Sequence, residues 1–160
     1  MIAHPIPPVY DKNSKILILG SFPSVKSREE GFFYGHPSNR FWKVISSLVG
    51  RDTPTSKEEK LAILRDSGIA LWDVIASCEI VGSSDSSIKN VTANDIRVIL
   101  ENTSLKGIFV NGKTAKKYYD KYIYPSLKIE AYCLPSTSPA NAVYSLPRLI
   151  KEWESILAFL

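Results

Sequence analysis

The sequence has few of the side chains that metal centres and disulfide frameworks require. Its 160 residues include 2 cysteines and 2 histidines and no CxxC pair. His4, His36, Cys78 and Cys133 are not spaced as ligands of one metal ion, and two cysteines can neither build a disulfide framework nor hold a four-cysteine iron–sulfur cluster. We therefore expect a protein without metal or cofactor, which keeps its thiols reduced in the cytoplasm.

Long apolar runs are also absent. The longest runs, such as ILIL at 16–19, have the length of a strand, so the sequence predicts no transmembrane helix. The first fifteen residues, MIAHPIPPVYDKNSK, are rich in proline and lack the apolar segment of a secretory signal. A hydrophobic content of 44% and a charged content of 22% are typical of a globular protein, and the length predicts one domain over residues 1–160.

Motifs of nucleotide-dependent and serine enzymes are missing. GxGxxG and GxSxG do not occur, and GIFVNGKT at 107–114 matches the phosphate-loop pattern only in its letters. A phosphate loop needs a strand before its first glycine, whereas here Ile108, Phe109 and Val110 form the expected strand themselves. The net charge of +4 and the isoelectric point near 9.0 favour a polyanionic partner.

Expected strands and helices alternate along the chain. The apolar pattern predicts four strands, at 15–20, 69–74, 107–111 and 128–134. Capping residues and helical spacing predict helices that begin after Ser38 or Asn39 and end at Gly50, and others at 56–67, 92–102, 113–123 and 145–160. Strands separated by helices imply right-handed crossovers and a parallel sheet covered on both faces.

The carboxyl ends of parallel strands are the usual ligand sites of such sheets. Here they read GSFPS (20–24), DVIASC (73–78), NGKTA (111–115) and LPSTSPAN (134–141). None of these loops carries a histidine, and Asp73 is their one carboxylate. A site at this edge would work with backbone amides, hydroxyls and asparagine amides.

The stretch EGFFYGHPSNRFW at 30–42 combines an irregular loop with the start of a helix. Phe41 and Trp42 fall on the apolar face of the expected helix, so we expect them in the core. Phe32, Phe33 and Tyr34 lie on a segment that two glycines and a proline keep irregular. Aromatic rings on such a loop either fill a core or line a pocket.

Taken in order along the chain, GSFPS, FFYGHPSNRFW and STSPAN resemble the motifs of the uracil-DNA glycosylase superfamily. YGHPSNRFW, ASCEIVGSSDSSI and FVNGKTA are more narrowly similar to its hypoxanthine-DNA glycosylase branch. The resemblance implies an α/β fold, a three-layer α/β/α sandwich around a four-stranded parallel sheet. It also implies an enzyme that flips a deaminated base out of DNA and hydrolyses its glycosidic bond without metal or cofactor.

The resemblance also assigns roles to individual residues. The first motif lacks the aspartate of the uracil branch, and STSPAN lacks its histidine. In the hypoxanthine branch, asparagines that match Asn39 and Asn111 are associated with catalysis. From the residues alone, a plain helix cap is the favoured role of Asn39, and Asn111 could equally be a turn residue. Asp85 is a candidate for orienting water, with a turn-capping role as the alternative.

Two further sets of candidates follow. The expected base-binding pocket consists of Gly20, Ser21, Phe22, Pro23, Phe32, Phe33 and Tyr34. The expected DNA-binding residues, which would hold phosphates, are Ser136, Thr137, Ser138, Pro139, Ala140, Asn141 and Lys113. The uracil branch places a leucine wedge near this loop, which Ala140 and Asn141 are too small to replace.

The sequence thus favours a monofunctional DNA-deoxyinosine glycosylase that acts as a monomer on double-stranded DNA containing deaminated bases. Excision of uracil by the same fold is an alternative. A module that binds nucleic acid without cleaving it also stays open, because no general base is evident. A nucleoside hydrolase is disfavoured, since that chemistry usually needs carboxylate clusters for a metal.

Overall fold

A four-stranded parallel sheet lies at the centre of the protein. The computed structural model describes all residues 1–160, and its central sheet has the strand order β3–β2–β6–β7 with every neighbouring pair parallel. The bounds are β2 Ile16–Gly20, β3 Ile69–Asp73, β6 Gly107–Asn111 and β7 Ala131–Leu134. The four strands expected from the apolar pattern are therefore confirmed, and so is their parallel arrangement.

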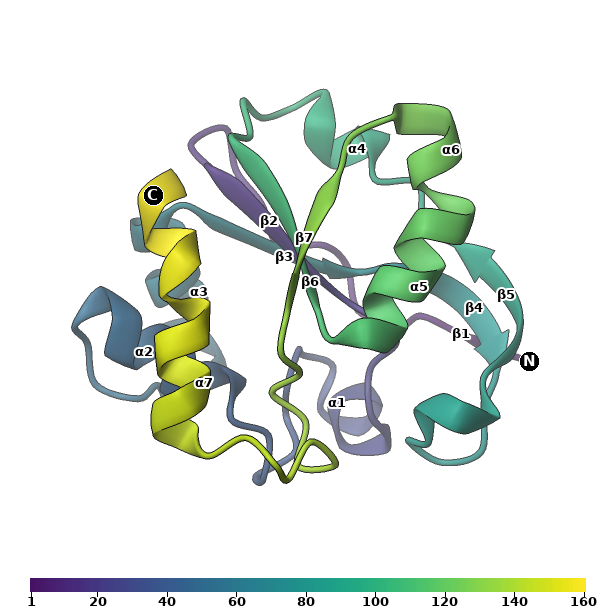
Figure 1. Cartoon of the computed structure of the whole chain (residues 1–160), viewed down its shortest axis with the longest axis horizontal. Helices are drawn as coiled ribbons and strands as arrows, with labels where there is room; N and C mark the ends of the chain where they lie inside the picture. Colours follow the sequence, from purple (N-terminus) through teal and green to yellow (C-terminus); the bar gives the residue numbers. More distant parts are fainter.

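Helices cover both faces of this sheet, as Figure 1 shows. Ile16 and Ile18 of β2 belong to one core cluster, with side chains of α2, α3 and α7, whereas Leu17 and Leu19 belong to the other, with side chains of α4 and α5. All four side chains are completely buried, which explains why β2 is continuously apolar. The three-layer α/β/α sandwich is confirmed. The helix bounds are α2 Phe41–Val49, α3 Lys57–Ser67, α4 Arg97–Leu100, α5 Lys113–Tyr122 and α7 Leu146–Trp153.

Local signals set several of the helix ends. Ser56 and Ser145 accept hydrogen bonds from first-turn amides of α3 and α7. Gly50 and Gly68 end α2 and α3 in the left-handed region, at φ 72° and 77°. These positions agree with the expected boundaries. The last helix is shorter than expected, because a 3₁₀ segment, η2 (Glu154–Phe159), replaces its end.

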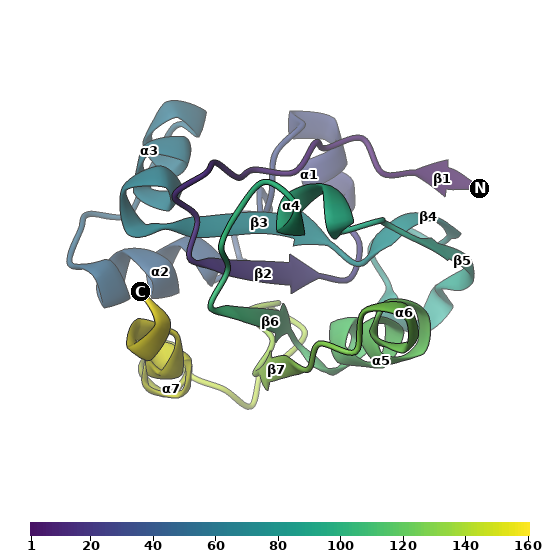
Figure 2. The ribbon, with the colours of Figure 1, turned by 90° about the horizontal axis from the view of Figure 1, so that it is seen from above.

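The protein also contains a second sheet, which the apolar pattern does not predict. The segment expected as a helix at 92–102 begins with the end of strand β5 (Lys89–Ala93) and is helical only over the short α4, so the expected length and start of this helix are wrong. β5 pairs antiparallel with β4 (Ile75–Glu79), which pairs in turn with β1 (Ile2–Ala3). Figure 2 shows this sheet at the end toward which β2 and β3 point.

The remaining elements are short. They are α1 (Val25–Glu30), α6 (Tyr124–Leu127) and the 3₁₀ turn η1 (Asp85–Ser87). None of the helices combines the length and the apolarity needed to cross a bilayer.

Candidate active site

A cavity of about 530 Å³ opens at the carboxyl ends of the parallel strands. Most of the expected site residues line it. They are Gly20, Ser21, Phe22, Pro23, Phe33, Tyr34, Asn39, Asp85, Asn111, Ser136, Thr137, Ser138, Pro139 and Ala140. Phe32, Asn141 and Lys113 are the expected site residues that do not line it. The loops of four strands therefore converge on one site, as the topology predicts.

The aromatic loop before α2 divides between core and cavity. Phe32 stacks on Trp42 in the core, with ring centroids 6.2 Å apart and an interplanar angle of 13°. Phe33 is 2% exposed, and its carbonyl oxygen accepts a 3.1 Å hydrogen bond from Trp42 Nε1. Tyr34 stacks on Phe41 at 4.1 Å. Of these rings, Phe33 and Tyr34 reach the cavity, while Phe32 supports them from behind.

Tyr34 is held in an unusual backbone conformation. Its φ of 53° lies in the left-handed region, where a bulky side chain is uncommon and must be held by its surroundings. Two contacts stabilise this conformation. The ring stacks on Phe41, and the hydroxyl oxygen of Tyr34 accepts a 3.2 Å hydrogen bond from Asn111 Nδ2. Burial, and to a smaller extent the charge of Asp73, raise the pKa of Tyr34, so the hydroxyl keeps its proton at neutral pH.

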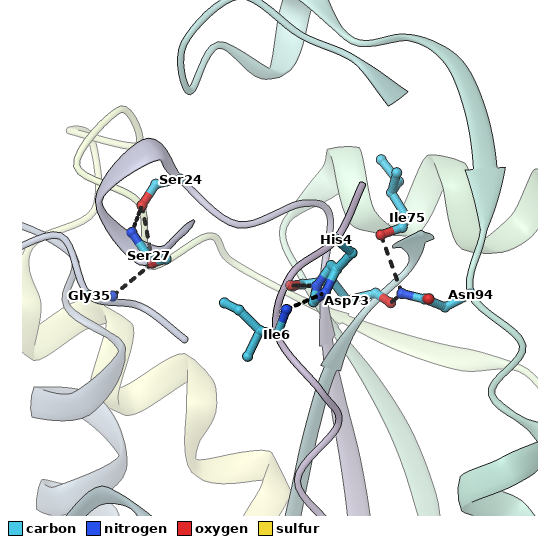
Figure 3. A network of polar contacts seen from close by, with 8 residues as sticks. All are labelled: His4, Ile6, Ser24, Ser27, Gly35, Asp73, Ile75 and Asn94. Carbon is cyan, nitrogen blue, oxygen red and sulfur yellow. Dashed lines mark hydrogen bonds and ion pairs between the residues drawn. The ribbon is translucent and has the colours of Figure 1, made fainter. Parts of the chain in front are cut away.

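α1 fixes the same loop from the other side. Its N-cap Ser24 accepts a hydrogen bond from the amide of Ser27. The Ser27 hydroxyl oxygen accepts hydrogen bonds from the Ser24 hydroxyl, at 3.1 Å, and from the amide of Gly35, at 2.9 Å. Figure 3 shows this chain of contacts between the two segments. The loop that carries Tyr34 is thus braced at both ends.

Asn39 stands at the entrance to α2, one residue before the N-cap position that Arg40 occupies. Its Oδ1 accepts a 2.9 Å hydrogen bond from the amide of Phe41 and a second one, also 2.9 Å, from Thr137 Oγ1. Its Nδ2 has no hydrogen-bond partner within the protein. The carbonyl end of the amide is therefore anchored, and the donor end remains free in the cavity wall.

Asn111 at the end of β6 is engaged on both ends. Its Nδ2 donates to the Tyr34 hydroxyl oxygen and to Thr137 Oγ1, and its Oδ1 accepts from the amide of Thr137 at 3.0 Å. Thr137 is completely buried, so its hydroxyl joins Asn111 to Asn39 beneath the cavity surface. Thr137 thus lies under the surface that the neighbouring loop residues present, and the catalytic role of Asn111 stays a prediction.

Arg40 organises the STSPAN loop from below. Its guanidinium donates to the carbonyl oxygens of Ser138, at 2.9 Å, Asn141, at 3.0 Å, and Tyr144. The Arg40 amide also donates to the carbonyl oxygen of Thr137, at 3.1 Å. Because these acceptors are backbone groups, one side chain sets the course of the whole loop. No local pattern in the sequence indicates this role of Arg40, because its partners lie about a hundred positions further along the chain.

The serine-rich segment before β5 forms another part of the rim. Asp85 in η1 accepts a hydrogen bond of 3.3 Å from the Ser21 hydroxyl. Removal of the carboxyl from bulk water raises the pKa of Asp85, while the hydrogen bond from Ser21 opposes the shift. Arg28 holds the segment through a 2.6 Å hydrogen bond to the carbonyl oxygen of Gly82. Asp85 is therefore a loop carboxylate at the cavity, and its role in catalysis stays a prediction.

Beneath the cavity, a buried histidine contacts the carboxylate of Asp73, which lines the cavity floor. His4 Nε2 lies 2.7 Å from Asp73 Oδ2, and both side chains are buried (Figure 3). Asp73 is the one carboxylate that the sequence places at the strand ends, whereas no local pattern indicates a role for His4. Its position follows from β1, because pairing with β4 continues through a 2.7 Å hydrogen bond from the His4 amide to the carbonyl oxygen of Ala76.

Cationic and metal-ligating groups are sparse at the site. Lys113 begins α5 as an exposed residue outside the cavity lining. Nowhere in the chain do three His, Cys, Asp or Glu side chains come together in a way that could hold a metal ion. What the site offers is a set of amides and hydroxyls with one oriented carboxylate on its floor.

Comparisons with known proteins agree with this architecture. The sequence model of the uracil DNA glycosylase superfamily matches residues 7–158. A protein of Methanosarcina acetivorans named hypoxanthine DNA glycosylase is 36% identical over 158 residues, which cover 98% of each chain. One of the same name from Methanosarcina barkeri is 35% identical over 137 residues, covering 84% of this chain and 85% of its own.

A solved structure shows the same fold. The solution NMR structure of a candidate uracil DNA glycosylase from Methanosarcina acetivorans matches with a TM-score of 0.82 at 36% identity, covering 98% of this chain and 96% of that chain. Sequence and fold thus agree over nearly the whole length, and the chain belongs to the uracil-DNA glycosylase superfamily.

Proposed function

We propose that this protein is a monofunctional DNA glycosylase that removes hypoxanthine from deoxyinosine in DNA. The observation that carries the proposal is the free Nδ2 of Asn39, whose Oδ1 is anchored by the Phe41 amide and by the Thr137 hydroxyl. The names of the two relatives at 36% and 35% identity support hypoxanthine as the base. The net charge of +4 agrees with a DNA substrate.

The reaction breaks the bond between C1′ of the deoxyribose and N9 of the flipped base. The bonding electrons leave with the base, the sugar acquires oxocarbenium character, and a water molecule adds to C1′ and releases a proton. Negative charge gathers on the departing base in the transition state. A preorganised donor such as Asn39 Nδ2 stabilises that charge without having to reorganise, and it stands at the start of α2, where the helix dipole favours negative charge.

The cavity suits a flipped base. Its volume of about 530 Å³ falls within the range of small-ligand sites, and the rings of Phe22, Phe33 and Tyr34 offer apolar contact for a purine. Ser136, Ser138 and Ala140 on the loop held by Arg40 stand where backbone amides and hydroxyls can contact the flanking phosphates. All of these residues belong to one chain, so a monomer can provide the complete site.

A lyase activity does not fit the same arrangement. A glycosylase that also cuts the strand needs an amine nucleophile in its pocket. No lysine lines the cavity, and the candidate at its edge, Lys113, is exposed at the start of α5. The product is therefore an intact strand with an abasic site. The free thiols Cys78 and Cys133 agree with action in a reducing cytoplasm.

End-labelled duplexes with one hypoxanthine, uracil or xanthine test the proposal. After incubation with the protein and then alkali, we expect cleavage at hypoxanthine and none before the alkali step. Preferential cleavage at uracil would favour the second function that the superfamily name suggests. Tight binding without release of any base would show a binding module, and a protein–DNA adduct trapped with borohydride would contradict the monofunctional mechanism.

A further inference from the structure

The pair of His4 and Asp73 places a carboxylate of fixed orientation on the cavity floor. Asp73 ends β3, and its side chain is 5% exposed; the side chain of His4 is 4% exposed. The Asp73 carbonyl oxygen accepts a 2.9 Å hydrogen bond from Asn94 Nδ2, so the backbone of this residue is fixed as well (Figure 3). No lysine or arginine forms an ion pair with Asp73.

The hydrogen bonds around His4 define which nitrogen carries the proton. The amide of Ile6 donates to His4 Nδ1 at 3.2 Å, so Nδ1 acts as an acceptor. The proton of the neutral ring therefore sits on Nε2 and is donated to Asp73 Oδ2 at 2.7 Å. One oxygen of the carboxylate is thus occupied by a neutral donor, and the negative charge remains on Asp73.

The other oxygen, Oδ1, has no hydrogen-bond partner within the protein. Gly20 makes room for it, because a Cβ atom at this position would lie 2.4 Å from Asp73 Oδ1 and 3.0 Å from the Tyr34 hydroxyl oxygen. Gly20, Tyr34 and Asp73 all line the cavity. Oδ1 is consequently a single, oriented, anionic acceptor beside the ring that is available to stack on a base.

We propose that Asp73, oriented by His4, is the specificity-determining residue that recognises a deaminated base by accepting a hydrogen bond from its ring N–H. This inference rests on the proposed function and names the feature of the base that the site reads. Hydrolytic deamination converts the acceptor N1 of adenine, or N3 of cytosine, into an N–H donor. A carboxylate oxygen attracts that donor and repels the lone pair of the normal base, and a buried mismatch of this kind is strongly disfavoured.

His4 adds discrimination against guanine. Guanine carries an N1–H and a 2-amino group side by side, which suit a carboxylate with two free oxygens. Here Oδ2 is occupied, and the 2-amino group would face the His4 Nε2–H, so two donors would be opposed. Hypoxanthine has one donor at this edge and matches the one free oxygen.

Equilibrium binding to uncleavable duplexes separates this role from catalysis. The probes carry 2′-fluoroarabino nucleotides of hypoxanthine, adenine or guanine, which resist cleavage of the glycosidic bond. In Asp73→Asn the amide oxygen accepts from His4, and the amide nitrogen turns a donor toward the cavity. We expect the preference for hypoxanthine over adenine to fall by roughly 10- to 100-fold, the usual discrimination of a well-placed base contact. Asp66→Asn, at an exposed carboxylate paired with Arg51, is the matched control and leaves the preference unchanged.

Two further measurements keep the inference testable if Asp73→Asn folds poorly. The wild-type protein should bind 1-deazaadenine more tightly than adenine, because a C–H replaces the repelled lone pair. His4→Ala should raise the affinity for guanine relative to hypoxanthine by freeing Oδ2. An unchanged preference for hypoxanthine in folded Asp73→Asn would overturn the inference. If the variant instead slowed hydrolysis equally for all bases while the binding preference persisted, the inference would also fall, and Asp73 would be assigned to water activation. Equal wild-type affinity for adenine and 1-deazaadenine would also overturn it. Failure of the wild-type protein to release hypoxanthine from ordinary deoxyinosine duplexes would refute the proposed function instead.

Discussion

Thr137 Oγ1 donates a hydrogen bond of 2.9 Å to Asn39 Oδ1, and the same oxygen accepts one of 3.0 Å from Asn111 Nδ2. One buried hydroxyl thus connects the two asparagines, which stand on different strand-end loops. The direction of these bonds leaves Asn39 with its donor end free. We therefore expect the activity of the site to depend on Thr137, although this hydroxyl is buried and need not touch the substrate.

Replacement of Thr137 tests this dependence. Thr137→Val keeps the shape but removes both side-chain hydrogen bonds and leaves buried partners unsatisfied, so we expect a loss of about 1–3 kcal/mol in the free energy of unfolding. Single-turnover base release should slow by roughly 10-fold or more, since Asn39 loses one of its two anchors. Thr137→Ser keeps the hydroxyl and is the control. Urea unfolding and single-turnover kinetics check both effects, and a Val variant as fast as the Ser variant would refute the positioning role.

Asn39 is expected to carry the largest catalytic effect. Asn39→Ala should slow single-turnover release of hypoxanthine by roughly 10²–10³-fold, the usual cost of one preorganised donor. Asn39→Asp should be equally slow, because the carboxylate accepts from the Phe41 amide and the Thr137 hydroxyl as before but cannot donate to the departing base. The Asp variant therefore separates chemistry from helix capping. Turnover near the wild-type rate in Asn39→Asp would indicate activation of water instead.

The order of strands and helices could be predicted from the sequence because the patterns that specify these elements are local. Continuous apolar strands, helical spacing and terminal glycines such as Gly50 and Gly68 specify elements within a few residues of themselves. The same kind of signal is misleading for the helix expected over 92–102, where Thr92 followed three positions later by Asp95 matches a helix-capping pattern. Pairing of Thr92 with Ser77 places it in a strand, and the Asp95 side chain caps the amide of Arg97 instead.

The hydrogen bonds between side chains within the site could not be predicted from the sequence. The motifs located Asn39 and Asn111, but no local pattern indicates that Thr137 joins them. The contact between His4 and Asp73 spans 69 positions and arises from a two-residue strand. Long-range contacts of this kind depend on how the second sheet packs. The spacing of residues along the chain does not predict that packing.

Independence from added metal is a direct expectation of this residue set. Base release should continue at an unchanged rate in excess chelator, since amides and hydroxyls supply the donors to the substrate and no cluster of three metal-ligating side chains is present. The assay compares single-turnover release with and without the chelator. A loss of activity that added zinc or magnesium restores would contradict the mechanism.

The effect of Asp85 on the stability of the folded protein should depend on pH. Partial burial raises the pKa of its carboxyl in the folded protein, so the charged form is less favourable there than in the unfolded chain. This penalty is fully present above the folded pKa and disappears below the unfolded pKa, near 3.9 for aspartate. Asp85→Asn should therefore have a higher Tm than the wild type at pH 7, and the difference should close as the pH falls below about 4. Thermal unfolding of both proteins at pH 7 and below about pH 4 checks this prediction. A Tm difference that grows as the pH falls would contradict it.

Arg40 should affect DNA binding more than chemistry. Its guanidinium holds three carbonyl oxygens of the loop at 138–144, and the loop residues Ser136, Ser138 and Ala140 line the cavity mouth. Arg40→Met keeps the apolar stem but releases the loop, so the loop amides that we propose to contact phosphates lose their common orientation. We expect the Kd for duplex DNA to rise by roughly 10-fold, which corresponds to about 1.4 kcal/mol.

The rate at saturating protein separates this effect from a disturbance of Asn39. Because the backbone amide of Arg40 still donates to Thr137, the network under Asn39 is preserved in the variant. Base release at saturation should therefore stay within a few-fold of the wild type. Arg40→Lys keeps the charge but cannot reach three carbonyls with a planar fork, so it should weaken binding nearly as much as Arg40→Met. If Arg40→Lys bound DNA as tightly as the wild type, Arg40 would contribute through its charge rather than through loop geometry. In that case the salt dependence of the Kd would be weaker in Arg40→Met but unchanged in Arg40→Lys.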